Sequence, residues 1–182
     1  MNAVRFWIVA ILGCAFAGGA FMYYNLVYAG YAELTADQVG EIQLLNVATD
    51  QPEAILSQNV KGIDTVKDGV RLSGAISYRV CFDTPSSQAM LSETYVIMDD
   101  AVPLNAPSWF DCFDAQAIGA ALETGDAIAF LSEENISYGV DRVVAVLPDG
   151  RGFVWHQLNP CGEAVFAGDN TPDGCPELPE DF

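Results

Sequence analysis

The sequence VDRVVAVLPDGRGFVWHQL, residues 140–158, carries the strongest structural signal in the chain. Its two arms, residues 140–147 and 152–158, are rich in β-branched and aromatic residues, and turn-forming residues that include Pro148 and Gly150 separate them. Two such runs joined by a short turn predict a β-hairpin. The alternation in the second arm places His156 on one face of its strand and Trp155 on the other.

Further strands are predicted over residues 41–45, 54–56, 70–82, 94–98 and 127–131. The clearest pattern lies in residues 70–82, where apolar residues or glycine alternate with polar ones, as they do in a half-buried strand. A turn is expected before it, at Asp68 and Gly69.

One helix is predicted outside the N-terminal region, over residues 115–124. Asp114 is a suitable N-cap and Gly125 a suitable C-terminal stop. The order of elements predicts an α+β protein, in which an N-terminal transmembrane helix precedes a mostly antiparallel β domain with one helix.

The composition excludes two classes of protein. Of the 182 residues, 25 are acidic and 7 are lysine or arginine, which gives a formal net charge of −18, while 51% are hydrophobic. A disordered acidic tail carries far fewer apolar residues. A nucleic-acid-binding protein needs a basic face that displaces counterions from phosphates, so we exclude nucleic acid as a partner.

Residues 6–32 contain no charged side chain, and we interpret residues 6–28 as a transmembrane signal anchor. A helix of this length crosses a hydrocarbon core of about 30 Å. Trp7 lies at one end of the span and several tyrosines lie at the other, as expected for rings at two membrane interfaces. Arg5 precedes the span and acidic residues follow it, so the positive-inside rule places the N-terminus in the cytoplasm.

This topology divides the chain into cytoplasmic residues 1–5, the anchor 6–28, a juxtamembrane linker 29–40, an extracytoplasmic domain 41–167 and an acidic, proline-rich tail 168–182. The corresponding location is a bacterial inner membrane, crossed once, with the domain in the periplasm.

Two alternatives for the N-terminal segment stay open. They are signal-peptidase cleavage at Ala15-Phe16-Ala17, and lipidation of Cys14 in a sequence close to a lipobox. Both would leave an apolar mature N-terminus, so the sequence favours an uncleaved anchor.

Four cysteines lie outside the anchor: Cys81, Cys112, Cys161 and Cys175. An even number in an exported domain predicts two disulfides, for which three pairings exist. We favour Cys81 with Cys112, and Cys161 with Cys175, the second closing a short loop worth about 3 kcal/mol. A zinc site is not expected, because the chain has one histidine and no Cys-x-x-Cys pair.

The residues offer little support for catalysis. His156 is the one histidine, and the sequence has neither a Gly-x-Ser-x-Gly motif nor a glycine-rich phosphate-binding loop. A histidine in a hairpin strand is most often a hydrogen-bonded structural residue, with catalysis or ligand sensing as the alternatives. An EF-hand-like spacing from Asp169 to Glu180 is interrupted by three prolines, so no metal and no cofactor are expected.

The proline-bounded segment 103–113 is a candidate contact surface because it contains Trp109 and Phe110. Tryptophan and other aromatic residues are favoured in protein interfaces. The alternative is a loop that folds back over the sheet and is held there by Cys112.

Several motifs resemble an uncharacterised family of small bacterial membrane-anchored proteins; they are CFD at 112–114, IGAA at 118–121, YGVDRVVAV at 138–146, PDGRG at 148–152 and VWHQ at 154–157. The resemblance includes the anchor and implies no catalytic residue, because the family has no assigned function. Some members are labelled histidine kinases. The sequence does not support that label, because His156 is expected in an extracytoplasmic strand and not on a dimerisation helix.

The function expected from the sequence is that of a single-pass, membrane-anchored periplasmic protein that acts as a non-enzymatic accessory or assembly module. Its partners would be the membrane, through residues 6–28, and a membrane or periplasmic protein. The alternative is a periplasmic ligand-binding sensor or an unrecognised hydrolase centred on His156, with a pocket around that residue.

Overall fold

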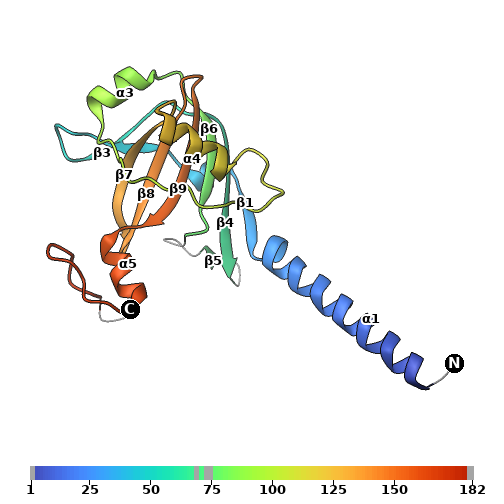
Figure 1. The fold of residues 1–182 in the computed structure, drawn as a ribbon. Coiled ribbons are helices and arrows are strands. Elements are labelled where there is room, and N and C mark those ends of the chain that lie inside the picture. The colour runs from blue at the N-terminus through green and yellow to red at the C-terminus, as the bar shows by residue number, and fades with distance from the viewer. Residues whose placement is uncertain (1–2, 68–69, 72–75, 180–182) are drawn as a thin grey trace.

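The computed structural model describes residues 3–67, 70–71 and 76–179. The first helix, α1 (Ala3–Tyr24), projects away from the rest of the protein, as Figure 1 shows. A short π-helix, η1 (Asn25–Ala29), continues it, and Gly30 alone separates η1 from the first strand, β1 (Tyr31–Leu34). The apolar helix predicted at the N-terminus is therefore present and could span a membrane by its length and composition.

The domain is built on one antiparallel sheet with the strand order β1-β4-β6-β9-β8-β7. The further strands of this path are β4 (Gln58–Lys67), β6 (Arg79–Asp83), β7 (Ile128–Ser137), β8 (Val140–Val146) and β9 (Arg151–Leu158). A two-residue strand, β5 (Val70–Arg71), pairs with β4 off this path. The predicted hairpin is confirmed, since β8 and β9 pair from Val140↔Leu158 to Val146↔Gly152.

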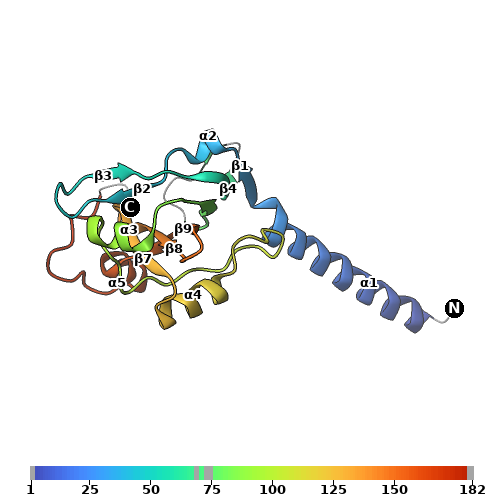
Figure 2. The ribbon, with the colours of Figure 1, turned by 90° about the horizontal axis from the view of Figure 1, so that it is seen from above.

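Both faces of the main sheet are covered. One face packs against a separate hairpin, β2 (Gln43–Leu45) with β3 (Pro52–Ala54), and against Leu91 of helix α3 (Gln88–Thr94). The other face packs against helix α4 (Ala115–Thr124) and the aromatic residues of the loop before it. Figure 2 shows β2–β3 and α4 on opposite sides of the main sheet.

The α+β class and the mostly antiparallel sheet are confirmed, and so are both ends of α4. Asp114 caps this helix by accepting hydrogen bonds from the backbone of Gln116 and Ala117, and Gly125 ends it in the left-handed region at φ 78°. The expectation of a single helix outside the anchor is wrong, because the structure also has α2 (Ala36–Val39), α3 and α5 (Pro160–Ala167).

The predicted long strand 70–82 is also wrong. The structure has β5, then a turn at Ile76 and Ser77, then β6, while residues 72–75 and the expected turn at Asp68 and Gly69 lie outside the described residues. The longest strand that the sequence analysis did not predict is β4. Both faces of β4 are covered, so neighbouring Ile63 and Asp64 are both buried and the strand has no apolar–polar alternation.

Two other segments differ from expectation. Residues 94–98 form no regular strand: Thr94 ends α3, and an extended stretch follows that makes isolated bridges from Tyr95 to Asn46 and from Ile97 to Phe130. The expected linker 29–40 contributes β1 and α2, and β1 forms an edge of the main sheet by pairing with β4. The described part of the tail, from residue 168, has neither helix nor strand.

Helix α5 crosses the β7–β8 turn at a glycine–glycine contact that leaves no space for a side chain. A Cβ atom added to Gly162 would lie 2.1 Å from the carbonyl oxygen of Gly139. We expect Gly162→Ala to destabilise the protein by about 1–3 kcal/mol, as overpacking does, and to lower its melting temperature in detergent.

The matched control is Gly119→Ala in α4, whose new Cβ would lie 3.7 Å from the nearest atom, in Pro103. Alanine favours a helix over glycine by about 1 kcal/mol, so this variant should melt at or above the wild-type temperature. A Gly162→Ala protein that melts like the wild type would contradict the contact.

Candidate functional site

His156, the one histidine, lies on β9 and is 2% exposed. The two residues before it project to opposite faces of the sheet, as in any strand. Val154 belongs to the apolar cluster under β2–β3, and Trp155 belongs to the cluster under α4. The histidine is therefore held inside the domain on the β2–β3 side of the sheet.

Four polar or aromatic side chains from adjacent parts of the sheet form a row, which we call the His156 row: Glu133, Arg142, His156 and Tyr78. The strand register places Glu133 opposite Arg142, and Arg142 opposite His156. Strand pairing aligns Glu133, Arg142 and His156, because directly opposed residues project from the same face. Tyr78 lies just before β6 and joins the row by stacking on the imidazole.

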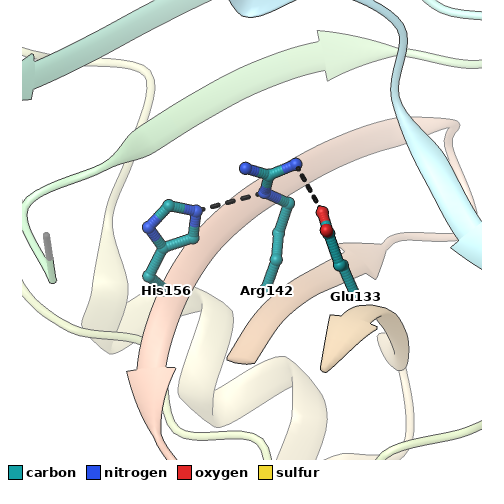
Figure 3. Close-up of polar contacts among 3 residues, drawn as sticks. All are labelled: Glu133, Arg142 and His156. Carbon is teal, nitrogen blue, oxygen red and sulfur yellow. Dashed lines mark hydrogen bonds and ion pairs between the residues drawn. The ribbon is translucent and has the colours of Figure 1, made fainter. Parts of the chain in front are cut away.

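The contacts within the His156 row are close. Arg142 Nε donates a hydrogen bond of 3.1 Å to His156 Nε2, and Arg142 Nη1 lies 3.4 Å from Glu133 Oε2, as Figure 3 shows. The Tyr78 ring stacks on the imidazole with centroids 4.5 Å apart, and the Arg142 guanidinium lies 5.4 Å from the Tyr78 ring centroid. The imidazole thus packs against the Tyr78 ring and accepts a hydrogen bond from Arg142.

This geometry limits what the imidazole can do in the observed state. Nε2 accepts a hydrogen bond from the Arg142 guanidinium, which is always a donor, so in this geometry the Nε2 lone pair is directed at Arg142. A catalytic histidine of the serine-hydrolase type is oriented by a carboxylate and keeps Nε2 for the nucleophile. Here Arg142 occupies Nε2, and the carboxylate of Glu133 contacts Arg142 at the outer, exposed end of the row.

One cleft is lined by the two residues that follow His156 in the chain, but not by His156 itself. It has a volume of about 560 Å³ and is lined by Gln157 and Leu158 of β9, and by residues of α5 and of the loop around Val102. Gln157 accepts hydrogen bonds from the Val102 backbone at 2.9 Å and from Trp155 Nε1 at 3.1 Å. None of the four residues of the His156 row lines this cleft, so it is not a pocket around the imidazole.

The structure pairs Cys81 with Cys112 and Cys161 with Cys175, which is the pairing favoured from the sequence. The first disulfide joins β6 to the residues just before α4, and the second joins α5 to the tail. Cys14, in α1, is free and exposed. Among the described residues, no group of three potential metal-ligating side chains comes together; Glu180 of the EF-hand-like spacing lies outside them.

The aromatic segment 103–113 folds back on its own chain. Phe110 is 9% exposed and belongs to the core under α4, so it offers little surface to a partner. Trp109 is half-buried, and its Nε1 donates a hydrogen bond of 2.8 Å to the carbonyl oxygen of Val27 at the end of the anchor. The structure thus places the residue expected to contact a partner against the apolar N-terminal helical segment of the same molecule.

Arg79 holds the start of this segment and was missed as a functional residue. It was expected on the polar side of a half-buried strand, but it is 3% exposed, and it donates from Nε to Leu104 O at 2.8 Å and from Nη2 to Asn105 O at 3.2 Å. Burial lowers the pKa of the Arg79 guanidinium to about 10, against the raising effect of Tyr31 and Asp64. The side chain therefore stays charged at neutral pH and binds the loop to the sheet.

Residues 42–176 match the model of a family of unknown function, DUF6446. The chain belongs to this family. The match covers the β2–β3 hairpin, the main sheet from β4 onward and both disulfides, and it begins after α1. No curated protein and no solved structure matches the chain. The DUF6446 assignment agrees with the predicted resemblance to an uncharacterised family, does not include the N-terminal helix, and assigns no activity to the His156 row.

Substitutions at His156 separate its two contacts. His156→Gln keeps an acceptor for Arg142 but loses the ring on Tyr78, whereas His156→Phe keeps a ring but leaves Arg142 Nε unpaired, at a cost of about 1–3 kcal/mol. His156→Ala loses both and should cost about 2–5 kcal/mol. We expect the alanine variant to have the lowest melting temperature.

Glu133→Gln is the control, because a partly exposed ion pair contributes at most about 1 kcal/mol. If His156→Ala had the same melting temperature as the wild type, the His156 row would have no structural role. The result would then favour ligand binding by the imidazole.

Proposed function

We propose that this protein is a single-pass membrane protein whose disulfide-bonded domain lies in the periplasm of a bacterium and serves as a non-enzymatic accessory or assembly module. The observation that carries the proposal is the exposed apolar helix at the N-terminus. Residues 3–29 form a helical segment that contains an 18-residue window of mean hydropathy 1.9, and none of that window is buried in the described protein. Side chains such as Phe16 and Phe21, 81% and 72% exposed, require a lipid environment.

The disulfides support an extracytoplasmic location. Structural disulfides persist in oxidising compartments and are rare in the cytosol. Arg5 precedes the helix and acidic residues follow it, which by the positive-inside rule favours a cytoplasmic N-terminus.

An interaction role is supported by where apolar side chains remain exposed on the domain. Val47, Leu56 and Met90 are 63%, 71% and 48% exposed, and they belong to the β2–β3 hairpin, to the residues after it and to α3. Both Figure 1 and Figure 2 show β3 and α3 at the side of the domain away from α1. We therefore propose this membrane-distal end as the contact surface, in place of Trp109 and Phe110.

The location proposal predicts the state of the cysteines in cells. Protein that is denatured without reductant should react with one maleimide, at Cys14, and with five after reduction, because four cysteines are paired. Mass spectrometry counts the labels.

A Cys14→Ser variant is the control and should take none before reduction. Five labels before reduction would contradict an oxidising compartment. A wild-type chain that takes none and carries additional lipid mass would show instead that Cys14 is the acylated residue.

The interaction proposal predicts a stoichiometric partner. Full-length protein purified from native membranes in mild detergent should bring down one protein in near-equal amount, and Leu56→Asp should reduce its recovery several-fold. Val102→Asp is the matched control, because Val102 is also exposed, at 62%, but lies in a different loop. Recovery of the protein alone, or equal loss in both variants, would contradict an interaction surface at the membrane-distal end.

A further inference from the structure

We propose that Trp109 seats the domain on the bilayer, with its indole at the level of the lipid headgroups of the leaflet from which α1 emerges. The surface that Trp109 contacts in this proposal is the zwitterionic headgroup region of the bilayer, not another protein. This inference rests on the membrane anchoring proposed above and adds to it a fixed position of the domain.

The length of α1 sets the level of the nearby aromatic residues. Its 22 residues extend about 33 Å, against a hydrocarbon core of about 30 Å. Tyr23 and Tyr24 therefore reach the membrane boundary, and η1, which carries Val27 and Tyr28, lies one turn farther out. Tyrosine and tryptophan concentrate at this depth, where the ring meets acyl chains and the polar group meets water.

Trp109 joins the anchor at this level. Besides its hydrogen bond to Val27 O, its ring stacks on Tyr28 with centroids 6.4 Å apart and packs edge-on against Tyr31 at 6.4 Å. The last carbonyls of a helix lack intrahelical donors. The indole N–H supplies such a donor to the carbonyl oxygen of Val27.

The loop that carries Trp109 is fixed to the domain on both sides. We call residues 104–112 the strap. Arg79 of β6 binds its first two carbonyls, at Leu104 and Asn105, and the disulfide from Cys112 to Cys81 of β6 holds its end. A loop tied at both ends to one strand transmits the position of the anchor to the sheet.

The charges of the domain favour a zwitterionic surface over an anionic one. The chain carries a net charge of −18, so an anionic leaflet would repel it. Beside the strap, a cleft of about 450 Å³ is lined by Trp109, the cation Lys61 and the acids Glu33 and Asp111. Such a mixed lining complements headgroups that carry both charges.

Depth-dependent quenching tests the seating. Full-length protein is reconstituted into phosphatidylcholine vesicles that carry a nitroxide on the headgroup or deep in the acyl chain. Trp7→Phe protein, which retains Trp109 and the fully buried Trp155, is compared with Trp7→Phe/Trp109→Phe protein, which retains Trp155 alone. We expect the headgroup probe to quench the first protein at least about twofold more than the second, as an interfacial indole requires.

Equal quenching of the two proteins would overturn the inference, and so would stronger quenching of Trp109 by the deep probe. Alkaline carbonate extraction of the same vesicles separates this result from a failure of the proposed function. Protein that is extracted contradicts the anchor, whereas protein that stays in the membrane with an unquenched Trp109 contradicts the seating alone.

A second measurement tests the contact between Trp109 and η1 without fluorescence. Trp109→Ala should accelerate chymotryptic release of the domain from the vesicles several-fold, because the tyrosines next to η1 lose their cover. Trp109→Phe, which keeps a ring for Tyr28 but loses the donor to Val27, should lie between the alanine variant and the wild type. Equal release rates for all three proteins, at unchanged melting temperature, would show that Trp109 does not hold the anchor.

Discussion

The fold depends on the burial of the β8–β9 hairpin on both of its faces. Val143, Val144, Val154 and Trp155 are almost fully buried, although adjacent residues of a strand project to opposite sides. Such a hairpin cannot be stable in water by itself, because each face needs a cover. The β2–β3 hairpin with α3 supplies one cover, and α4 with the strap supplies the other.

This two-sided burial explains which parts of the fold could be predicted from the sequence. β8 and β9 have long β-branched runs and a strong turn signal, and α4 has a capping aspartate and a terminal glycine, so their limits follow from local chemistry. β4 could not be recognised, because the buried Asp64 and Gly62 interrupt its apolar pattern. For α5 the local signals exist, with Asn159 as N-cap and Gly168 in the left-handed region, but the helix has only eight residues and no distinct separation of an apolar from a polar face.

The same reasoning applies to the candidate site. Alternation was sufficient to place His156 on the face opposite Trp155. The neighbours of the imidazole could not be predicted, because Arg142 reaches it through the β8–β9 register and Tyr78, which precedes β6, reaches it by stacking across a long sequence separation. Likewise, two aromatic residues in a proline-bounded loop look alike in sequence whether they face a partner or their own chain. Only the position of Val27 shows that Trp109 contacts the anchor.

The short connection between η1 and β1 couples the orientation of the domain to that of α1. One residue, Gly30, separates the helical segment from the sheet, and Trp109 bridges the two, so the helix and the domain rotate together. A transmembrane helix tilts more in a thin bilayer and less in a thick one. If α1 spans a bilayer, as proposed above, the angle at which the membrane-distal end faces its surroundings varies with the hydrophobic thickness of that bilayer.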